Sequence, residues 1–183
     1  MVRNGVDTHR LLATLDLLAS RPELGRFRLR ASNRWIDGTH NRSTIRGFHG
    51  AGCEDTSRAA PFELDAGAPA VLLGTDTGAT PAEHLLHALA ADLTTAIVYV
   101  AAARRVELAS VDSEVVGHID VRGCLGLDGE PGSGSERVAV TLRIAGDAPE
   151  AVLRAIAEHA AAHSPVHDML RRGVHVAVDV SAG

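Results

Sequence analysis

The sequence has few aromatic residues, few cysteines and no long uninterrupted hydrophobic run. Aromatic residues make up 3% of its 183 residues, so aliphatic side chains and alanine must fill the core. No segment reaches the roughly 18 uninterrupted apolar residues of a membrane span, and no basic-then-apolar signal opens the chain. We therefore expect a cytoplasmic protein with no membrane partner.

A large excess of positive charge is also absent. The net charge is -5, and acidic and basic residues are interspersed along the chain. This pattern is typical of a solvated surface and argues against a general nucleic-acid binder. The two cysteines, Cys53 and Cys124, lie far apart and have no metal-like spacing. Two unpaired thiols are the favoured interpretation, with a disulfide or redox pair as the alternative.

The longest predicted element is a helix over residues 80–104. Thr80 is a natural N-cap, Pro81 suits the first helical position, and Glu83 completes a capping box. Asp92 shares one face of this helix with four residues at three-or-four spacing, Leu85, Leu89, Ala96 and Tyr99. A carboxylate on an apolar face is costly unless it is paired, hydrogen-bonded or protonated.

The remaining pattern predicts an α+β domain whose helices pack on antiparallel sheet. Expected helices cover residues 6–20, residues from Pro149 to about 163, and a turn over 166–170. Expected strands cover 26–36, 39–48, 62–64, 106–121, 137–144 and 174–180, with loops over 47–57, 66–78 and 128–135. We divide the chain into an N-terminal helical extension, 1–24, and a single domain, 25–183.

Three motifs carry a resemblance to a known family. They are WIDGTHNR at 35–42, PAEHLLHALAADLT at 81–94 and SPV at 164–166. With these motifs the chain resembles the OsmC/Ohr family from about Arg26 to Val180. The resemblance implies an intertwined homodimer, in which antiparallel sheets wrap long central helices and pockets form at the subunit interface. Typical members are thiol peroxidases that reduce organic hydroperoxides with a cysteine pair.

The resemblance breaks at the reactive residues. The family's peroxidatic cysteine aligns with Asp92, its resolving cysteine with Ser164, and its glutamate with Ala82. The family arginine is retained as Arg42. Because peroxide reduction needs a thiolate nucleophile, we expect no cysteine-based peroxidase activity.

The substituted positions suggest a different chemistry, namely non-redox acid/base catalysis on a small, largely apolar organic molecule. Asp92 would act as general acid or base, and a histidine can assist a carboxylate near neutral pH. Arg42 would hold an oxyanion or carboxylate. The remaining candidates are His163, His167 and Ser164 for catalysis, and His40, Leu89 and Ala96 for substrate binding. The expected enzyme is of lyase, isomerase or hydrolase type, with no cofactor and no metal.

Other interpretations of these residues stay open. Asp92 would be purely structural if it formed a buried ion pair with Arg42. His159, His163 and His167 repeat every fourth residue and would form a metal site with Asp92. Ser164, a histidine and Asp92 formally provide a hydrolase triad, although no nucleophile-elbow motif is present. The alternative to an enzyme is a non-catalytic small-molecule binder or an inactive structural homologue.

Overall fold

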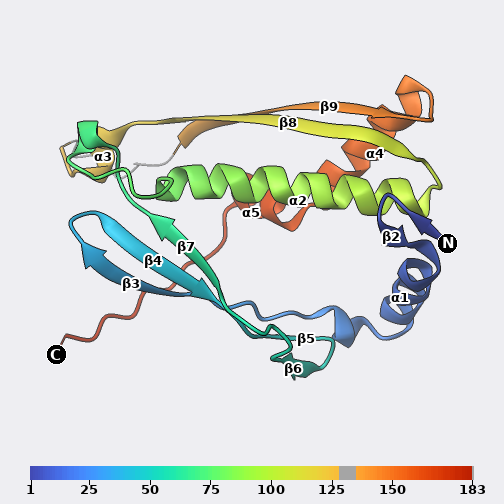
Figure 1. Cartoon of the computed structure of the whole chain (residues 1–183), viewed down its shortest axis with the longest axis horizontal. Helices are drawn as coiled ribbons and strands as arrows, with labels where there is room; N and C mark the ends of the chain where they lie inside the picture. Colours follow the sequence, from blue (N-terminus) through green and yellow to red (C-terminus); the bar gives the residue numbers. More distant parts are fainter. Residues whose placement is uncertain (128–134, 183) are drawn as a thin grey trace. The chain divides into compact units, whose positions relative to one another are not determined.

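The computed structural model describes residues 1–127 and 135–182, so the expected loop over 128–135 lies almost wholly outside the described residues. The chain divides into two compact units. The N-terminal unit is His9–Leu85, and the C-terminal unit joins Leu86–Gly183 with Met1–Thr8. Both helices and antiparallel sheets are present, which confirms the α+β class (Figure 1).

The C-terminal unit is built around helix α2, Pro81–Ala103, most of which belongs to it. Its other main elements are strand β8 (Leu108–Ile119), helix α3 (Val121–Cys124), strand β9 (Ser135–Gly146), helix α4 (Glu150–His163) and helix α5 (Pro165–Arg172). Strands β8 and β9 form a long antiparallel hairpin that runs along α2 (Figure 1).

The core of this unit lies between α2, the β8–β9 hairpin and α4. Ile97 and Ala101 from α2 pack with Leu153, Ile156 and Ala160 from α4. The inner side chains of the hairpin, including Val111, Leu142 and Ile144, cover this cluster. The i, i+3, i+4 spacing in α4 and the alternation in β9 are the patterns that predicted these two elements.

A short hairpin at the N-terminus also belongs to the C-terminal unit. Strands β1 (Val2–Arg3) and β2 (Val6–Asp7) are joined by Asn4 and Gly5, whose φ angles are 50° and 77°. An Asn-Gly pair with positive φ is the preferred two-residue hairpin turn. The Asn4 side chain donates to the Val106 carbonyl and accepts from the Leu108 amide, both at 2.9 Å. The hairpin is thus fastened to the start of β8.

The N-terminal unit contains helix α1 and two small antiparallel sheets. Its elements are α1 (Thr8–Ser20), 3-10 turns at Pro22–Gly25 and Ala70–Leu72, and strands β3 (Ser32–Asp37), β4 (His40–Ile45), β5 (Phe48–Gly50), β6 (Cys53–Asp55) and β7 (Phe62–Ala66). Strands β3, β4 and β7 form an antiparallel sheet with β4 in the centre. Gly38, with φ of 52°, makes the tight β3–β4 turn predicted from Asp37-Gly38.

Several predicted strands need correction. Residues 26–31 are not a strand except for a bridge between Arg28 and His49, and the strand begins at Ser32. The predicted strand over 39–48 ends at Ile45, and the predicted loop over 47–57 contains the β5–β6 hairpin. The strand predicted over 106–121 ends at Ile119, and Cys124 lies in the short helix α3.

The closing strand predicted over 174–180 is also wrong for the single chain. This segment has no regular secondary structure, and Val174, Val176, Val178 and Val180 are all exposed. An alternating pattern encodes a strand only where another strand supplies hydrogen bonds, and none pairs with this segment in the described structure.

Candidate functional site

The start of α2 has the geometry that the capping box predicts. The Thr80 amide donates to Glu83 Oε2 at 2.7 Å, and the Glu83 amide donates to Thr80 Oγ1 at 3.2 Å. The Thr80 amide, and then the Thr80 hydroxyl, which also donates to Oε2 at 2.8 Å, lower the pKa of the Glu83 carboxyl. Glu83 is therefore a cap, as expected, and it leaves Asp92 as the acidic residue inside the helix.

Asp92 lies beside the buried stripe of α2 rather than within it. The stripe consists of Leu89, Leu93, Ile97 and Ala101 at four-residue spacing. Asp92 and Ala96 are half-buried at its edge, while Leu85 and Tyr99 are exposed in the single chain. Of the apolar residues predicted to share a face with Asp92, Leu89 is therefore buried in this chain and Ala96 packs against the core, whereas Leu85 and Tyr99 are exposed.

The carboxylate of Asp92 is joined directly to Ser164. The Ser164 hydroxyl donates to Asp92 Oδ2, and the Val166 amide donates to the same oxygen at 3.1 Å. In the described part of the chain Oδ1 of Asp92 accepts no hydrogen bond. The two positions that align with the family's cysteines thus lie in contact, with one carboxylate oxygen uncommitted.

Ser164 is fixed as the N-cap of α5. Its Oγ accepts from the His167 amide at 3.0 Å, Pro165 occupies the first helical position, and only 1% of the residue is exposed. The amides of Val166 and His167 would otherwise be unpaired at the start of the helix. Because the hydroxyl donates to a carboxylate and not to an imidazole, this arrangement does not form a Ser-His-Asp triad.

The two candidate histidines differ in their surroundings. His167 is half-buried, and its Nδ1 lies 2.8 Å from the Ala161 carbonyl. His163 is exposed, its Nδ1 lies 2.8 Å from the His159 carbonyl, and its ring stacks on His159. A carbonyl only accepts, so each Nδ1 carries the proton and the neutral ring has its lone pair on Nε2.

Arg42 and His40 meet at a carboxylate that sequence reasoning did not single out. In the N-terminal unit, Arg42 donates from Nε to Asp65 Oδ1 and from Nη2 to Asp65 Oδ2, both at 2.9 Å. His40 Nε2 lies 2.8 Å from Asp65 Oδ1. The bonds from Arg42 and then from His40 lower the pKa of Asp65 to about 2.

The first turn of α2 also contacts this cluster, because His84 Nε2 lies 3.0 Å from the Asp65 carbonyl. The only sequence signal for Asp65 is that it directly follows the short strand predicted over 62–64, which extends as β7 to Ala66.

The two groups of candidates belong to different units. Asp92, Ser164, His163 and His167 lie in the C-terminal unit, and Arg42 and His40 lie in the N-terminal unit. The convergence of Arg42 with Asp92 therefore stays a prediction.

No cysteine and no set of metal ligands lies around Asp92 or around Asp65 in the described part of the chain. Cys53 in β6 and Cys124 in α3 are free and exposed. Among the described residues, no three histidine, cysteine or acidic side chains lie close enough to hold a metal ion. The polar groups that do gather around Asp92 are a hydroxyl, a backbone amide and, through Ser164, the backbone of His167.

The fold and these clusters define an α+β protein with a polar site at a central helix. The family model of the OsmC-like proteins matches residues 74–179, which is more than half of the chain. This chain therefore belongs to the OsmC-like family, a family of soluble proteins. No curated protein matches it in sequence.

Solved structures show the same fold at low sequence identity. The chain is similar to an OsmC-like protein from Mycoplasma pneumoniae, with a TM-score of 0.61, 15% identity and coverage of 80% of this chain and 89% of that one. A hypothetical protein from Aquifex aeolicus gives a TM-score of 0.56 at 14% identity, covering 79% and 88%. The organic hydroperoxide resistance protein OsmC from Legionella pneumophila gives 0.52 at 17% identity, covering 78% and 88%.

Proposed function

We propose that this OsmC-like protein catalyses non-redox acid/base chemistry on a small, largely apolar organic molecule, with Asp92 as the proton-transferring group. The supporting observation is the carboxylate geometry. Oδ2 is held by Ser164 and Val166, while Oδ1 has no partner in the described chain. A carboxylate fixed through one oxygen presents the other in a defined direction, as general acid–base catalysis requires.

His167 is the better placed of the two histidines to assist. It is half-buried, its backbone amide is bonded to Ser164, and its ring is oriented by the Ala161 carbonyl. In the neutral ring Nε2 is then free to accept a proton. Ser164 is assigned a positioning role, because its donor and an acceptor site are both already used.

We further propose that the working form is a homodimer and that the substrate enters a pocket completed by both subunits. By length and composition α2 is apolar enough to span a membrane, yet only 28% of its most apolar stretch is buried. Core helices of soluble proteins have the same composition. In a soluble family an apolar helix that is only partly covered, with Leu85 and Tyr99 exposed, favours burial against a second copy.

The test has two stages. First, purified protein is screened against a panel of small organic acids, esters and carbonyl compounds for binding and for turnover. Then Asp92→Asn is compared with wild type on any compound that is converted. The asparagine carbonyl can still accept from Ser164 and Val166, so we expect binding and melting temperature to survive. Turnover should fall by about 100-fold or more, the usual contribution of a general acid or base.

A matched control is Asp112→Asn, which removes the same charge from an exposed position on β8. This variant should keep full turnover. Unchanged turnover in Asp92→Asn would overturn the acid/base role. Equal losses in both variants would assign the effect to net charge and not to Asp92.

One observation favours the alternative, a non-catalytic binder or structural homologue. The bonds of Asp92 to Ser164 and Val166 tie α2 to the start of α5, which is a sufficient structural reason for a carboxylate there. A panel compound that binds at low concentration and is recovered unchanged, with or without Asp92, would support this alternative.

A further inference from the structure

A second polar feature occupies one face of the β3–β4 hairpin. Ser32 pairs with Thr44 and Arg34 pairs with Arg42 across the two antiparallel strands. Directly opposite residues, and residues two apart on one strand, point to the same side of a sheet. Two hydroxyls and two guanidinium groups are therefore gathered on one face, and all four can donate hydrogen bonds.

Like charges directly opposite each other destabilise a strand pair unless they are neutralised. Arg42 is neutralised by β7: Asp65 bonds it through both oxygens, and Glu63 lies 3.5 Å from Nη1. Arg34 forms no ion pair in the part of the chain that the structure describes, and it is exposed. The N–H groups of Arg34 are therefore available to a ligand, next to Arg42, whose charge is neutralised by Asp65 and Glu63.

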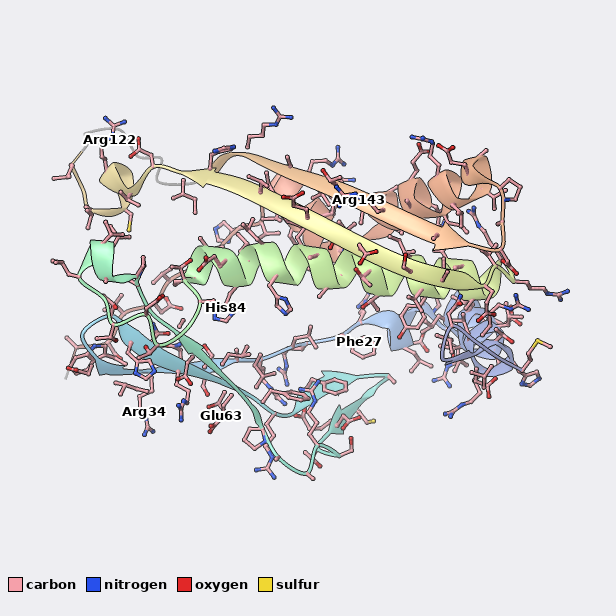
Figure 2. The ribbon with its side chains drawn as sticks, turned by 45° about the horizontal axis from the view of Figure 1, so that its top comes forward. Phe27, Arg34, Glu63, His84, Arg122 and Arg143 are labelled. Carbon is pink, nitrogen blue, oxygen red and sulfur yellow. The ribbon has the colours of Figure 1, made fainter. Side chains whose placement is uncertain are left out.

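The same face is hollowed. A cavity of about 480 Å³ is lined by residues that include Ser32, Arg34, Ile36, Arg42, Thr44 and Glu63. Figure 2 shows Arg34 and Glu63 extending on the same side of this sheet. This volume lies in the usual range for small-molecule sites.

We propose that this hollow binds the oxyanion group of a small molecule, a carboxylate or a phosphate, through Arg34 with Ser32 and Thr44. The planar guanidinium group of Arg34 matches two oxygens of such a group. The hydroxyls of Ser32 and Thr44 complete its coordination, and Ile36 provides apolar contact for the rest of the ligand.

The neighbouring acidic residues limit the ligand to one or two charges. Glu63 lines the hollow, and Asp65 lies one alternation further along β7 on the same face. A polyanion such as nucleic acid would meet these carboxylates and the net charge of -5. A small carboxylic acid or a phosphate monoester carries only one or two charges and is therefore compatible with Glu63 and Asp65. The site does not depend on any role for Asp92.

The test is titration of the full chain with inorganic phosphate and, separately, with acetate, followed by backbone amide NMR shifts at low ionic strength. We expect saturating shifts at residues 32–36 and 42–44. Arg34→Gln should weaken this binding about tenfold or more, as expected for loss of a charge-assisted bidentate contact. The ion that binds with the higher affinity, phosphate or acetate, identifies the class of the oxyanion.

The matched control is Arg28→Gln, an exposed arginine in the same unit that does not line the hollow. It should leave binding within about twofold of wild type, as should Asp92→Asn. Shifts spread over exposed arginines, or equal weakening by Arg34→Gln and Arg28→Gln, would overturn the proposal. If Arg34→Gln folds poorly, Ser32→Ala combined with Thr44→Val supplies an independent variant, and unchanged binding there would also contradict the site.

Discussion

Asp92 and Asp65 are both carboxylates with several hydrogen bonds, but their partners give them different properties. Asp92 is held by neutral donors, a hydroxyl and an amide, on one oxygen. Asp65 is held on both oxygens by a guanidinium group and on one by an imidazole. Asp65 is therefore fixed as an anion through both oxygens, whereas Oδ1 of Asp92 accepts no hydrogen bond from the described residues.

The pKa of Asp65 predicts a pH dependence of stability. Its native pKa is about 2, below the value of about 4 expected for an unfolded aspartate. A depressed native pKa gives stability that is present above the unfolded value and is lost as pH falls through the native one. Asp65→Asn should therefore melt below wild type at pH 5–7, and the difference should disappear as pH falls from about 4 to about 2.

Thermal melts of both proteins across that range provide the measurement. Asp55→Asn is a comparison variant, because the pKa of Asp55 is also lowered but chiefly by Ser57, a neutral neighbour, so its melting-temperature difference should depend on pH with the same sign. A melting-temperature difference for Asp65→Asn that stayed constant down to pH 2 would show that its ion pair with Arg42 does not contribute.

Residues fixed by local sequence were predictable and those fixed by tertiary contacts were not. The Thr80–Glu83 cap follows from a four-residue pattern. The bond from Ser164 to Asp92 joins residues 72 positions apart, and that from Arg42 to Asp65 spans 23. The family alignment suggested the first contact, while no pattern in the sequence indicates the second.

At the scale of the element, the helices α2 and α4 and the β8–β9 hairpin follow from periodicity and turn residues. The N-terminal hairpin was missed because strands of two residues show no period. Its signal is Asn4-Gly5, the preferred turn pair. The predicted strand over 174–180 failed for the opposite reason, since its alternation is clear but no strand pairs with it in the described chain.

We expect Asn4→Ala to loosen this hairpin. The substitution removes the bonds to Val106 and Leu108 and places alanine at a φ of 50°. The loss of unfolding free energy should be about 1–3 kcal/mol, with a fall in melting temperature of about 2–4 °C per kcal/mol for a chain of this size.

Differential scanning calorimetry measures the change. Asn4→Gly is the informative control, because glycine accepts the φ angle and loses only the side-chain bonds. If Asn4→Ala melts at the wild-type temperature, the hairpin does not contribute to the stability of the C-terminal unit.

At the scale of the whole molecule, the two units differ in how much core they possess. The C-terminal unit has a continuous buried cluster, whereas the only buried hydrophobic residue among the described positions of the N-terminal unit is Ala66. Phe27, Leu29, Phe62 and Leu64 are all exposed there. Such a unit needs further contacts to be stable.

We therefore expect an obligate dimer in which dissociation coincides with unfolding. Obligate interfaces bury about 2,000 Å² or more, and the exposed apolar residues of α2 and of the N-terminal unit provide area of this kind. Sedimentation velocity at micromolar concentration should show one species of twice the chain mass, and the melting temperature should rise with protein concentration. A folded, stable monomer under these conditions would contradict the dimer and the two-subunit pocket.

The only tryptophan of the chain lies on β3, one residue from Arg34 and on the opposite face of the sheet. Its indole N–H donates to the Gly38 carbonyl at 2.9 Å, and 69% of Trp35 is exposed. The ring is thus held at the hairpin turn but is open to solvent, so its fluorescence in an uncovered chain should lie at the red end of the tryptophan range. Any surface that comes to cover this sheet will shift the emission to the blue. The emission wavelength of Trp35 therefore reports, without an added label, whether its face of the β3–β4–β7 sheet is exposed to solvent or covered.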